Sequence, residues 1–243
     1  MSTPAPQIRT SVVLLAGAAV AWAVTVERMR GMDEGPGTHL GGLGWYLGIW
    51  VTMMAAMMLP SAAPAAVRVA RLARRAPTVL FAAGYLFVWT GFGVAAYALY
   101  RLVTAFDTGW LAWDKGGPYL TGGLVLAAGI YELTPLKRHC LDRCRNPSPN
   151  GDALRSGLAY GRDCVGCSGG LMVVLFALGV MSLVWMVVVA GVIFAEKLFP
   201  RGVELSRVVA VALIALGAWV AFSPSSVPGL TEPDEAPAMH MEP

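Results

Sequence analysis

Four cysteines in two closely spaced pairs are the residues of this sequence best suited to chemistry. They form the patterns Cys140-x-x-x-Cys144 and Cys164-x-x-Cys167. Residues four apart on a helix share one face, and the turn at a helix start brings a C-x-x-C pair together. Because both pairs fall within one 33-residue segment that begins at Pro135, they can supply four sulfur ligands. Tetrahedral sulfur suits Zn(II), and thiolates also suit Cu(I) or iron–sulfur clusters.

Other interpretations of the cysteines stay open. The pair Cys164 and Cys167 also suits a dithiol redox centre, with Cys140 and Cys144 as a relay. Cysteines at helix ends can also be small apolar residues without a chemical role. His139 is a possible nitrogen ligand, but on a helix it points about 100° away from its neighbour Cys140.

A run of methionines is the second feature. Met53, Met54, Met57 and Met58 lie in six residues of one apolar segment, and the i, i+4 spacing puts them on two adjacent helix faces. A thioether is a soft donor that prefers Cu(I), so the run is a candidate auxiliary metal site. The alternative is packing, because methionine fills irregular gaps well. Three more methionines lie in a later apolar segment: Met172, Met181 and Met186.

Glu132 is the third feature, because it is an acidic residue at the inner edge of an apolar segment. An ionisable group close to hydrocarbon is costly and marks a functional candidate, here a metal ligand. Pairing with Lys137 is the alternative interpretation. Met239, His240 and Met241 near the end of the chain are a weak signal for a soft metal.

Composition indicates which elements must position these residues. Only 14% of the 243 residues are charged and 56% are hydrophobic, whereas soluble domains have about 25% charged residues. This excludes a cytosolic globular domain and a nucleic-acid binder. A helix of about 20 residues crosses the hydrocarbon core. We therefore predict an all-α transmembrane bundle of about six spans, near residues 11–26, 43–59, 79–100, 119–133, 169–195 and 208–222.

The distribution of basic residues predicts the orientation of the bundle. Eleven Lys and Arg residues fall on the side of the cysteine loop and seven on the other. The positive-inside rule then places both termini and the cysteine loop in the cytoplasm, with the chain in the inner (plasma) membrane. Reduced thiols persist in the cytoplasm and remain available for metal.

The chain is expected to form one domain. Residues 1–222 make up the bundle, residues 135–168 form a cytoplasmic cysteine-bearing loop, and residues 223–243 form a disordered acidic tail. The start of the chain also resembles a secretory signal with a cleavage site at Ala21-Trp22-Ala23. Because the apolar run continues to Val26, a retained helix suits it better.

The order of motifs from about residue 45 to residue 200 resembles a family of bacterial integral membrane proteins of unknown function, predicted to bind metal. The matching segments are Trp50 with Met53 to Pro60, Tyr131 to Lys137, Cys140 to Pro147, Tyr160-Gly161 with the C-x-x-C pair, Gly179 to Met186, and Glu196-Lys197. The resemblance implies a helical membrane fold and a metal site.

This chain departs from the family pattern just after the C-x-x-C pair. A further cysteine and a tryptophan are expected there, where this chain has Ser168 and Gly169. If the additional family cysteine is a ligand, the site in this chain relies on Cys140 and Cys144.

Taken together, these features predict a membrane protein that binds a soft metal ion, copper or zinc, and handles or delivers it. The expected partners are the lipid bilayer and another membrane protein or a metalloenzyme, without nucleic acid. Motifs of nucleotide-binding and hydrolytic enzymes are absent from the sequence, so an enzyme is not indicated. The alternatives are a membrane thiol oxidoreductase that uses the C-x-x-C pair, and a non-catalytic subunit that stabilises a membrane complex.

Overall fold

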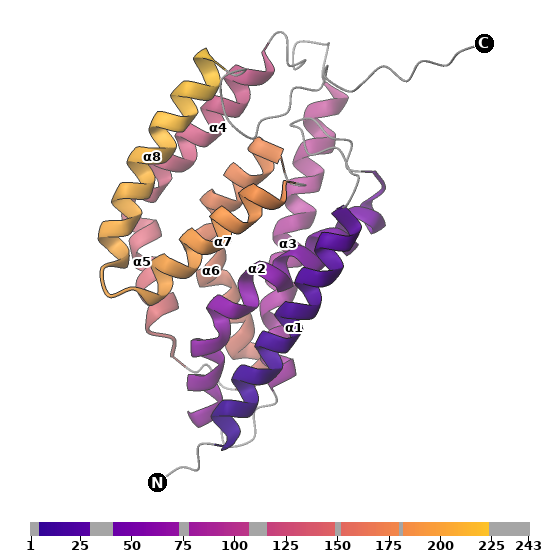
Figure 1. The fold of residues 1–243 in the computed structure, drawn as a ribbon, viewed down its shortest axis with the longest axis vertical. Helices are drawn as coiled ribbons and strands as arrows, with labels where there is room; N and C mark the ends of the chain where they lie inside the picture. The colour runs from indigo at the N-terminus through magenta and orange to yellow at the C-terminus, as the bar shows by residue number, and fades with distance from the viewer. Residues whose placement is uncertain are drawn as a thin grey trace, which may run out of the picture.

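The computed structural model describes residues 5–29, 41–72, 78–106, 116–148, 152–179 and 182–223. These residues form an all-helical bundle, which confirms the predicted fold class for the described part of the chain (Figure 1). The helices are α1 (Ala5–Met29), α2 (Leu43–Leu72), α3 (Thr78–Ala105), α4 (Gly117–Glu132), α5 (Pro135–Arg145), α6 (Ala153–Gly179), α7 (Leu183–Leu198) and α8 (Gly202–Phe222).

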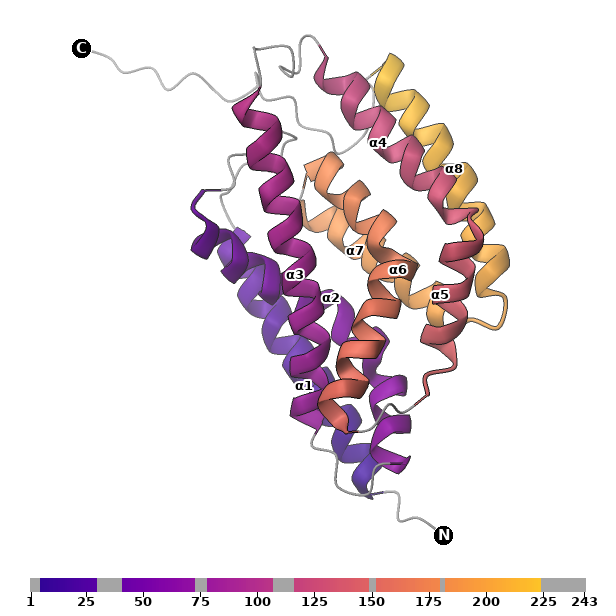
Figure 2. The same cartoon turned by 180° about the vertical axis from the view of Figure 1, so that it is seen from behind.

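Three helix pairs make up most of the bundle. Helix α1 packs along α2, α3 along α6, and α4 along α8 (Figures 1 and 2). The short helices α5 and α7 contact α6 between these pairs. The start of α1 and the end of α8 lie at opposite ends of the long axis (Figure 1). The predicted location of both termini on the same side of a membrane stays a prediction.

Five of the described helices are long and apolar enough to cross a membrane, α1, α2, α3, α6 and α8, so the predicted number of about six spans is not confirmed. The predicted span 119–133 corresponds to the shorter helix α4, and the predicted span 169–195 is divided between α6 and α7. Helix α6 ends at Gly179, Ser182 before α7 is extended with ψ of 113°, and α7 runs back toward the end from which α6 started (Figure 1). Helices α4 and α7, with 16 residues each, are shorter than a full span.

The predicted cysteine loop 135–168 is also mainly helical. Thr134 caps α5 by accepting a hydrogen bond from the Lys137 backbone N–H, and Pro135 occupies the first turn. These are the residue types that favour a helix start. The C-x-x-C pair lies inside α6 rather than before a helix. The predicted tail, apart from Ser223, lies outside the described residues.

Glycines allow the closest helix contacts. A Cβ at Gly122 on α4 would lie 2.5 Å from the Gly217 carbonyl oxygen on α8, and one at Gly217 would lie 2.7 Å from the Gly122 carbonyl oxygen. A Cβ at Gly84 on α3 would lie 3.1 Å from the Leu158 backbone nitrogen on α6. Small residues at crossings let helix backbones approach closely, as is common in membrane bundles.

Candidate metal site

One sulfur pair joins the two cysteine motifs. Cys144, near the end of α5, lies 3.3 Å from Cys167 on α6, measured between the Sγ atoms. Cys144 is 5% exposed and Cys167 is 1% exposed. The contact forms because α5 packs directly against α6. The structure therefore brings together thiols from two separate stretches of the sequence.

Cys164 precedes Cys167 by less than one helical turn and is fully buried. Its Sγ accepts a hydrogen bond from Lys197 Nζ at 2.9 Å and lies 3.1 Å from the Tyr85 hydroxyl. Lys197 also donates to Ser61 Oγ at 3.2 Å. A neighbouring positive charge stabilises the thiolate form of a cysteine, which is the form that binds metal.

Cys140 differs from the other three cysteines in being partly exposed. It packs against α6 at Gly166, where an added Cβ would overlap its Sγ atom. Burial raises the pKa of this thiol above its ordinary value. Within the described ranges, no group of three or more His, Cys, Asp or Glu side chains is placed to hold a metal ion. Of the four sulfurs expected to converge, those of Cys144 and Cys167 are in direct contact, and the side chain of Cys164 interacts with both.

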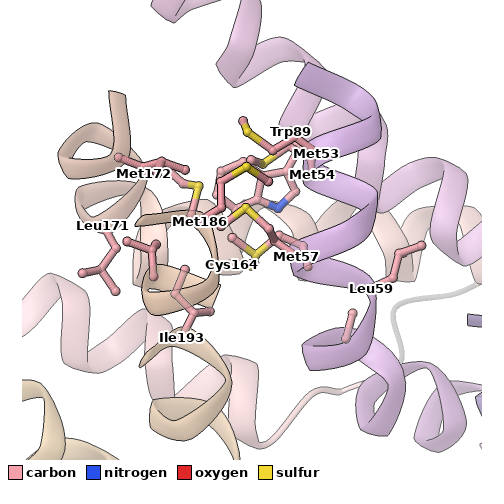
Figure 3. Close-up of a cluster of buried hydrophobic side chains, with 14 of the residues drawn as sticks. Met53, Met54, Met57, Leu59, Trp89, Cys164, Leu171, Met172, Met186 and Ile193 are labelled. Atoms are coloured by element: carbon pink, nitrogen blue, oxygen red, sulfur yellow. The ribbon is translucent and has the colours of Figure 1, made fainter. Parts of the chain in front are cut away.

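The methionine run of α2 faces the interior of the bundle. Met53, Met54, Met57 and Met58 are each at most 3% exposed. Figure 3 shows the first three with side chains directed toward a space that also receives sulfur-bearing side chains from α6 and α7. Those side chains are Met172 and Cys164 on α6, and Met186 on α7.

This arrangement places thioethers beside Cys164 (Figure 3), an adjacency that the sequence alone did not predict. Met172 and Met186 are at most 1% exposed and join the same buried cluster as the α2 methionines and three of the cysteines. Met181 lies outside the described residues. We call the buried methionines Met53, Met54, Met57, Met58, Met172 and Met186, with Cys144, Cys164 and Cys167, the sulfur cluster.

Glu132 lies in a different buried group, which we call the carboxylate cluster: Glu132, Lys137, Glu196 and Ser206. Lys137 Nζ donates to the carboxylates of Glu132 and Glu196, the latter at 2.8 Å. Ser206 Oγ donates to the other oxygen of Glu196 at 2.9 Å. The structure therefore places Glu132 in the alternative role, an ion pair with Lys137, away from the cysteines.

Two buried residues of α5, Lys137 and Cys144, have shifted pKa values. Burial works to lower the pKa of Lys137, but Glu196 and Glu132 outweigh it and raise the pKa above its ordinary value. Lys137 is therefore a fixed cation. Hydrogen bonds with Cys164 and Cys167, together with burial, raise the pKa of Cys144 well above its ordinary value. Without metal, Cys144 is therefore a thiol.

The sequence analysis did not identify Glu196 and Lys197 as residues of a functional site. Both are buried, at 1% and 8% exposed, and they point into different clusters. Their position at the end of an apolar helix was the available signal. His139 is exposed on α5 and contacts no sulfur in the described structure. His240 and its methionine neighbours lie outside the described residues.

Comparison with known protein families supports a role with copper. Residues 47–220 match the PpoB2 family, which is described as a copper chaperone. This chain belongs to the PpoB2 copper chaperone family. The match runs from α2 to α8 and so includes both clusters. No curated protein and no solved structure matches the chain. Membership of this family supports the predicted metal-binding family and, of the two metals expected, copper.

Proposed function

We propose that this protein is a membrane-embedded copper chaperone that holds Cu(I) at the sulfur cluster and passes it to a partner metalloprotein. The supporting observation is the contact between Cys144 and Cys167, 3.3 Å apart, in the buried core that also contains the thioethers of α2, α6 and α7. Cu(I) is the cargo of this protein, and thiolate and thioether sulfur are its preferred ligands.

The donor set favours copper over zinc. Structural zinc sites use four Cys, His or carboxylate ligands in a tetrahedron. The carboxylates of Glu132 and Glu196 form ion pairs with Lys137, and Cys140, unlike the other cysteines, is partly exposed. What remains near Cys144 and Cys167 is one further thiol and thioethers, a set that suits a soft monovalent ion.

Binding requires a rearrangement of the sulfur pair. With metal–sulfur bonds of about 2.3 Å, a trigonal or linear site places two sulfurs roughly 4.0–4.6 Å apart, and Cys144 and Cys167 lie at 3.3 Å. A bound Cu(I) would push the two sulfurs apart by about an ångström. Their protons would leave when copper binds, because the thiolate is the metal ligand.

The sequence favours delivery of copper to a partner over active pumping of copper across a membrane. The sequence lacks a nucleotide-binding motif that would couple transport to hydrolysis. The five membrane-compatible helices and the buried position of the sulfur cluster support a protein that holds copper within the bilayer region. In our proposal α5 and its cysteines lie on the cytoplasmic side of the protein.

The test is Cu(I) binding by the full chain purified in detergent, measured by competition with a coloured Cu(I) chelator. We expect tight binding of at least one Cu(I), and a loss of about 100-fold or more in affinity in the Cys144→Ser/Cys167→Ser variant, equivalent to about 2.7 kcal/mol. Cys140→Ser is the matched control and should bind as the wild type does. Equal affinity in the double variant and the wild type would remove the proposal.

A thiol oxidoreductase is the second candidate, because the 3.3 Å separation of Cys144 and Cys167 is also close to what a disulfide needs. Thiol exchange with another protein requires room for that protein's thiol, and Cys144 and Cys167 are only 5% and 1% exposed. Thiol trapping in cells separates the two functions. A mixed disulfide with another protein would favour the redox function, whereas uniformly reduced, metal-protected thiols would favour copper.

A further inference from the structure

A cavity of about 210 Å³ opens beside the sulfur cluster and is lined by three basic residues. Arg68 comes from the end of α2, Arg145 from the end of α5, and Lys197 from the end of α7. Cys144 lines the same cavity, together with Ser61 and Tyr160 among others, and no acidic residue is among the described lining residues. A concave site lined by charges of one sign concentrates the opposite charge.

Two arginines of the cavity are open to an anion. Arg145 donates to the backbone carbonyls of Glu196 at 3.1 Å and Pro200 at 3.2 Å, which are uncharged acceptors that hold its guanidinium. Arg68 is exposed on α2. Lys197 lies at the inner end of the cavity, where Ser61 and the sulfur of Cys164 are its hydrogen-bond partners. The cavity is therefore a basic site for an anion, with a thiol of the sulfur cluster in its wall.

We propose that this cavity binds the carboxylates of a small anionic thiol that carries Cu(I), and so presents the copper to Cys144. This inference rests on the proposed copper function. Arg68 and Arg145 would hold the carboxylates by charge-assisted hydrogen bonds. Because the cavity is small, it takes the anionic end of such a carrier and leaves the remainder outside.

The transfer is a ligand exchange without redox change. One bond between Cu(I) and the carrier sulfur breaks as a bond to the Sγ atom of Cys144 forms. Cys144 gives up its proton to the departing carrier, which leaves as a neutral thiol group. Copper stays Cu(I) throughout. Cys167, 3.3 Å from Cys144, then supplies the next sulfur on the path into the cluster.

The first experiment measures how fast the full chain in lipid-free detergent takes up Cu(I) from two carriers, glutathione and its uncharged-carboxyl diethyl ester. We expect Arg68→Gln to slow loading from the glutathione complex about tenfold, and loading from the ester complex less than twofold. Arg138→Gln, an exposed arginine on α5 outside the cavity, is the matched control and should change neither rate. Equal slowing with both carriers, or no slowing with either, would overturn the inference.

A second measurement separates this inference from the copper function. S-methylglutathione keeps the carboxylates of glutathione but has no free thiol, so its binding by calorimetry reports the anion site alone. We expect the wild type to bind it and Arg68→Gln to bind at least about tenfold more weakly. If the chain binds Cu(I) but not S-methylglutathione, the anion site is wrong. If it binds S-methylglutathione but not Cu(I), the anion site stands and the copper function fails.

A lipid headgroup is the competing source of anionic groups, and it is tested in the same system. Bilayer nanodiscs of phosphatidylglycerol and of phosphatidylcholine replace the detergent. The inference expects the glutathione preference of the wild type to persist in both. Loss of S-methylglutathione binding in phosphatidylglycerol alone would mean that the cavity holds a headgroup, and the inference would be wrong.

Discussion

The sulfur cluster and the carboxylate cluster are both buried, and consecutive residues of α7 connect them. Glu196 points to Lys137 and Ser206, whereas Lys197 points to Cys164 and Ser61. One cluster contains hard oxygen donors and an ammonium group, and the other contains soft sulfur donors. Because successive helical residues are rotated by about 100°, the end of α7 takes part in both.

The two clusters differ in the interactions that hold their members. Lys137 is shared by two carboxylates, so internal ion pairs hold the carboxylate cluster, although Glu132 Oε1 has no hydrogen-bond partner within the described structure. In the sulfur cluster, the cysteines contact one another, two hydroxyl groups and one ammonium group, and thioethers form only weak hydrogen bonds. The carboxylate cluster therefore suits a structural role, and the sulfur cluster keeps donors that an incoming soft ion can use.

Removing the cation of the carboxylate cluster should have the largest effect on stability. Lys137→Met leaves the carboxylates of Glu132 and Glu196 buried without their shared partner. Breaking a buried ion pair in this way costs about 3–5 kcal/mol. Thermal unfolding of the purified variant in detergent should show a large fall in Tm, with Arg138→Met on the same helix as the control. An unchanged Tm would show that the cluster does not stabilise the fold.

Removing Lys197, the cation that contacts the sulfur cluster, should lower the free energy of unfolding by a smaller amount. In Lys197→Met, Cys164 can take up a proton and become neutral, an option that costs a thiol much less than it costs a pair of ion-paired carboxylates. The expected loss is about 1–2 kcal/mol, mainly from the hydrogen bonds to Cys164 and Ser61. Chemical denaturation of Lys197→Met and Lys137→Met under one condition makes the comparison. Equal losses would contradict the distinction between the clusters.

Replacing a thioether should change copper binding more than stability. Met57→Leu and Met186→Leu conserve volume, so each should cost less than about 1.5 kcal/mol in unfolding free energy. Each removes a soft donor, and we expect Cu(I) affinity to fall about fivefold, or about 1 kcal/mol. Ile193→Leu, a change in the same buried cluster without a sulfur atom, is the control. If Met→Leu and Ile→Leu variants bind copper alike, the methionines only pack.

The sequence carried the all-helical fold and the shared faces of the α2 methionines, because both follow from hydropathy and helical spacing. It predicted the C-x-x-C pair before a helix rather than inside α6. The reason is that Arg155, Arg162 and Asp163 lower the mean hydropathy of the first half of α6, so the apolar segment begins only at residue 169. The start of α5 was readable from Thr134 and Pro135, which are a favoured cap and first-turn residue.

The composition of each cluster could not be predicted from local pattern. Cys140 and Cys144 share a helix face by spacing, yet Cys144 contacts Cys167 whereas Cys140 packs against Gly166. The opposite directions of Glu196 and Lys197 depend on which helices flank α7. Packing between helices far apart in the sequence sets both outcomes, and a single sequence contains no direct record of it.

The most direct test of the account is X-ray absorption at the copper edge of the Cu(I)-loaded full chain. We predict an inner shell of two or three sulfur atoms and no nitrogen or oxygen, changed in Cys144→Ser/Cys167→Ser and unchanged in Cys140→Ser. A shell dominated by nitrogen or oxygen, or one that the double variant leaves intact, would contradict a copper site built on Cys144 and Cys167.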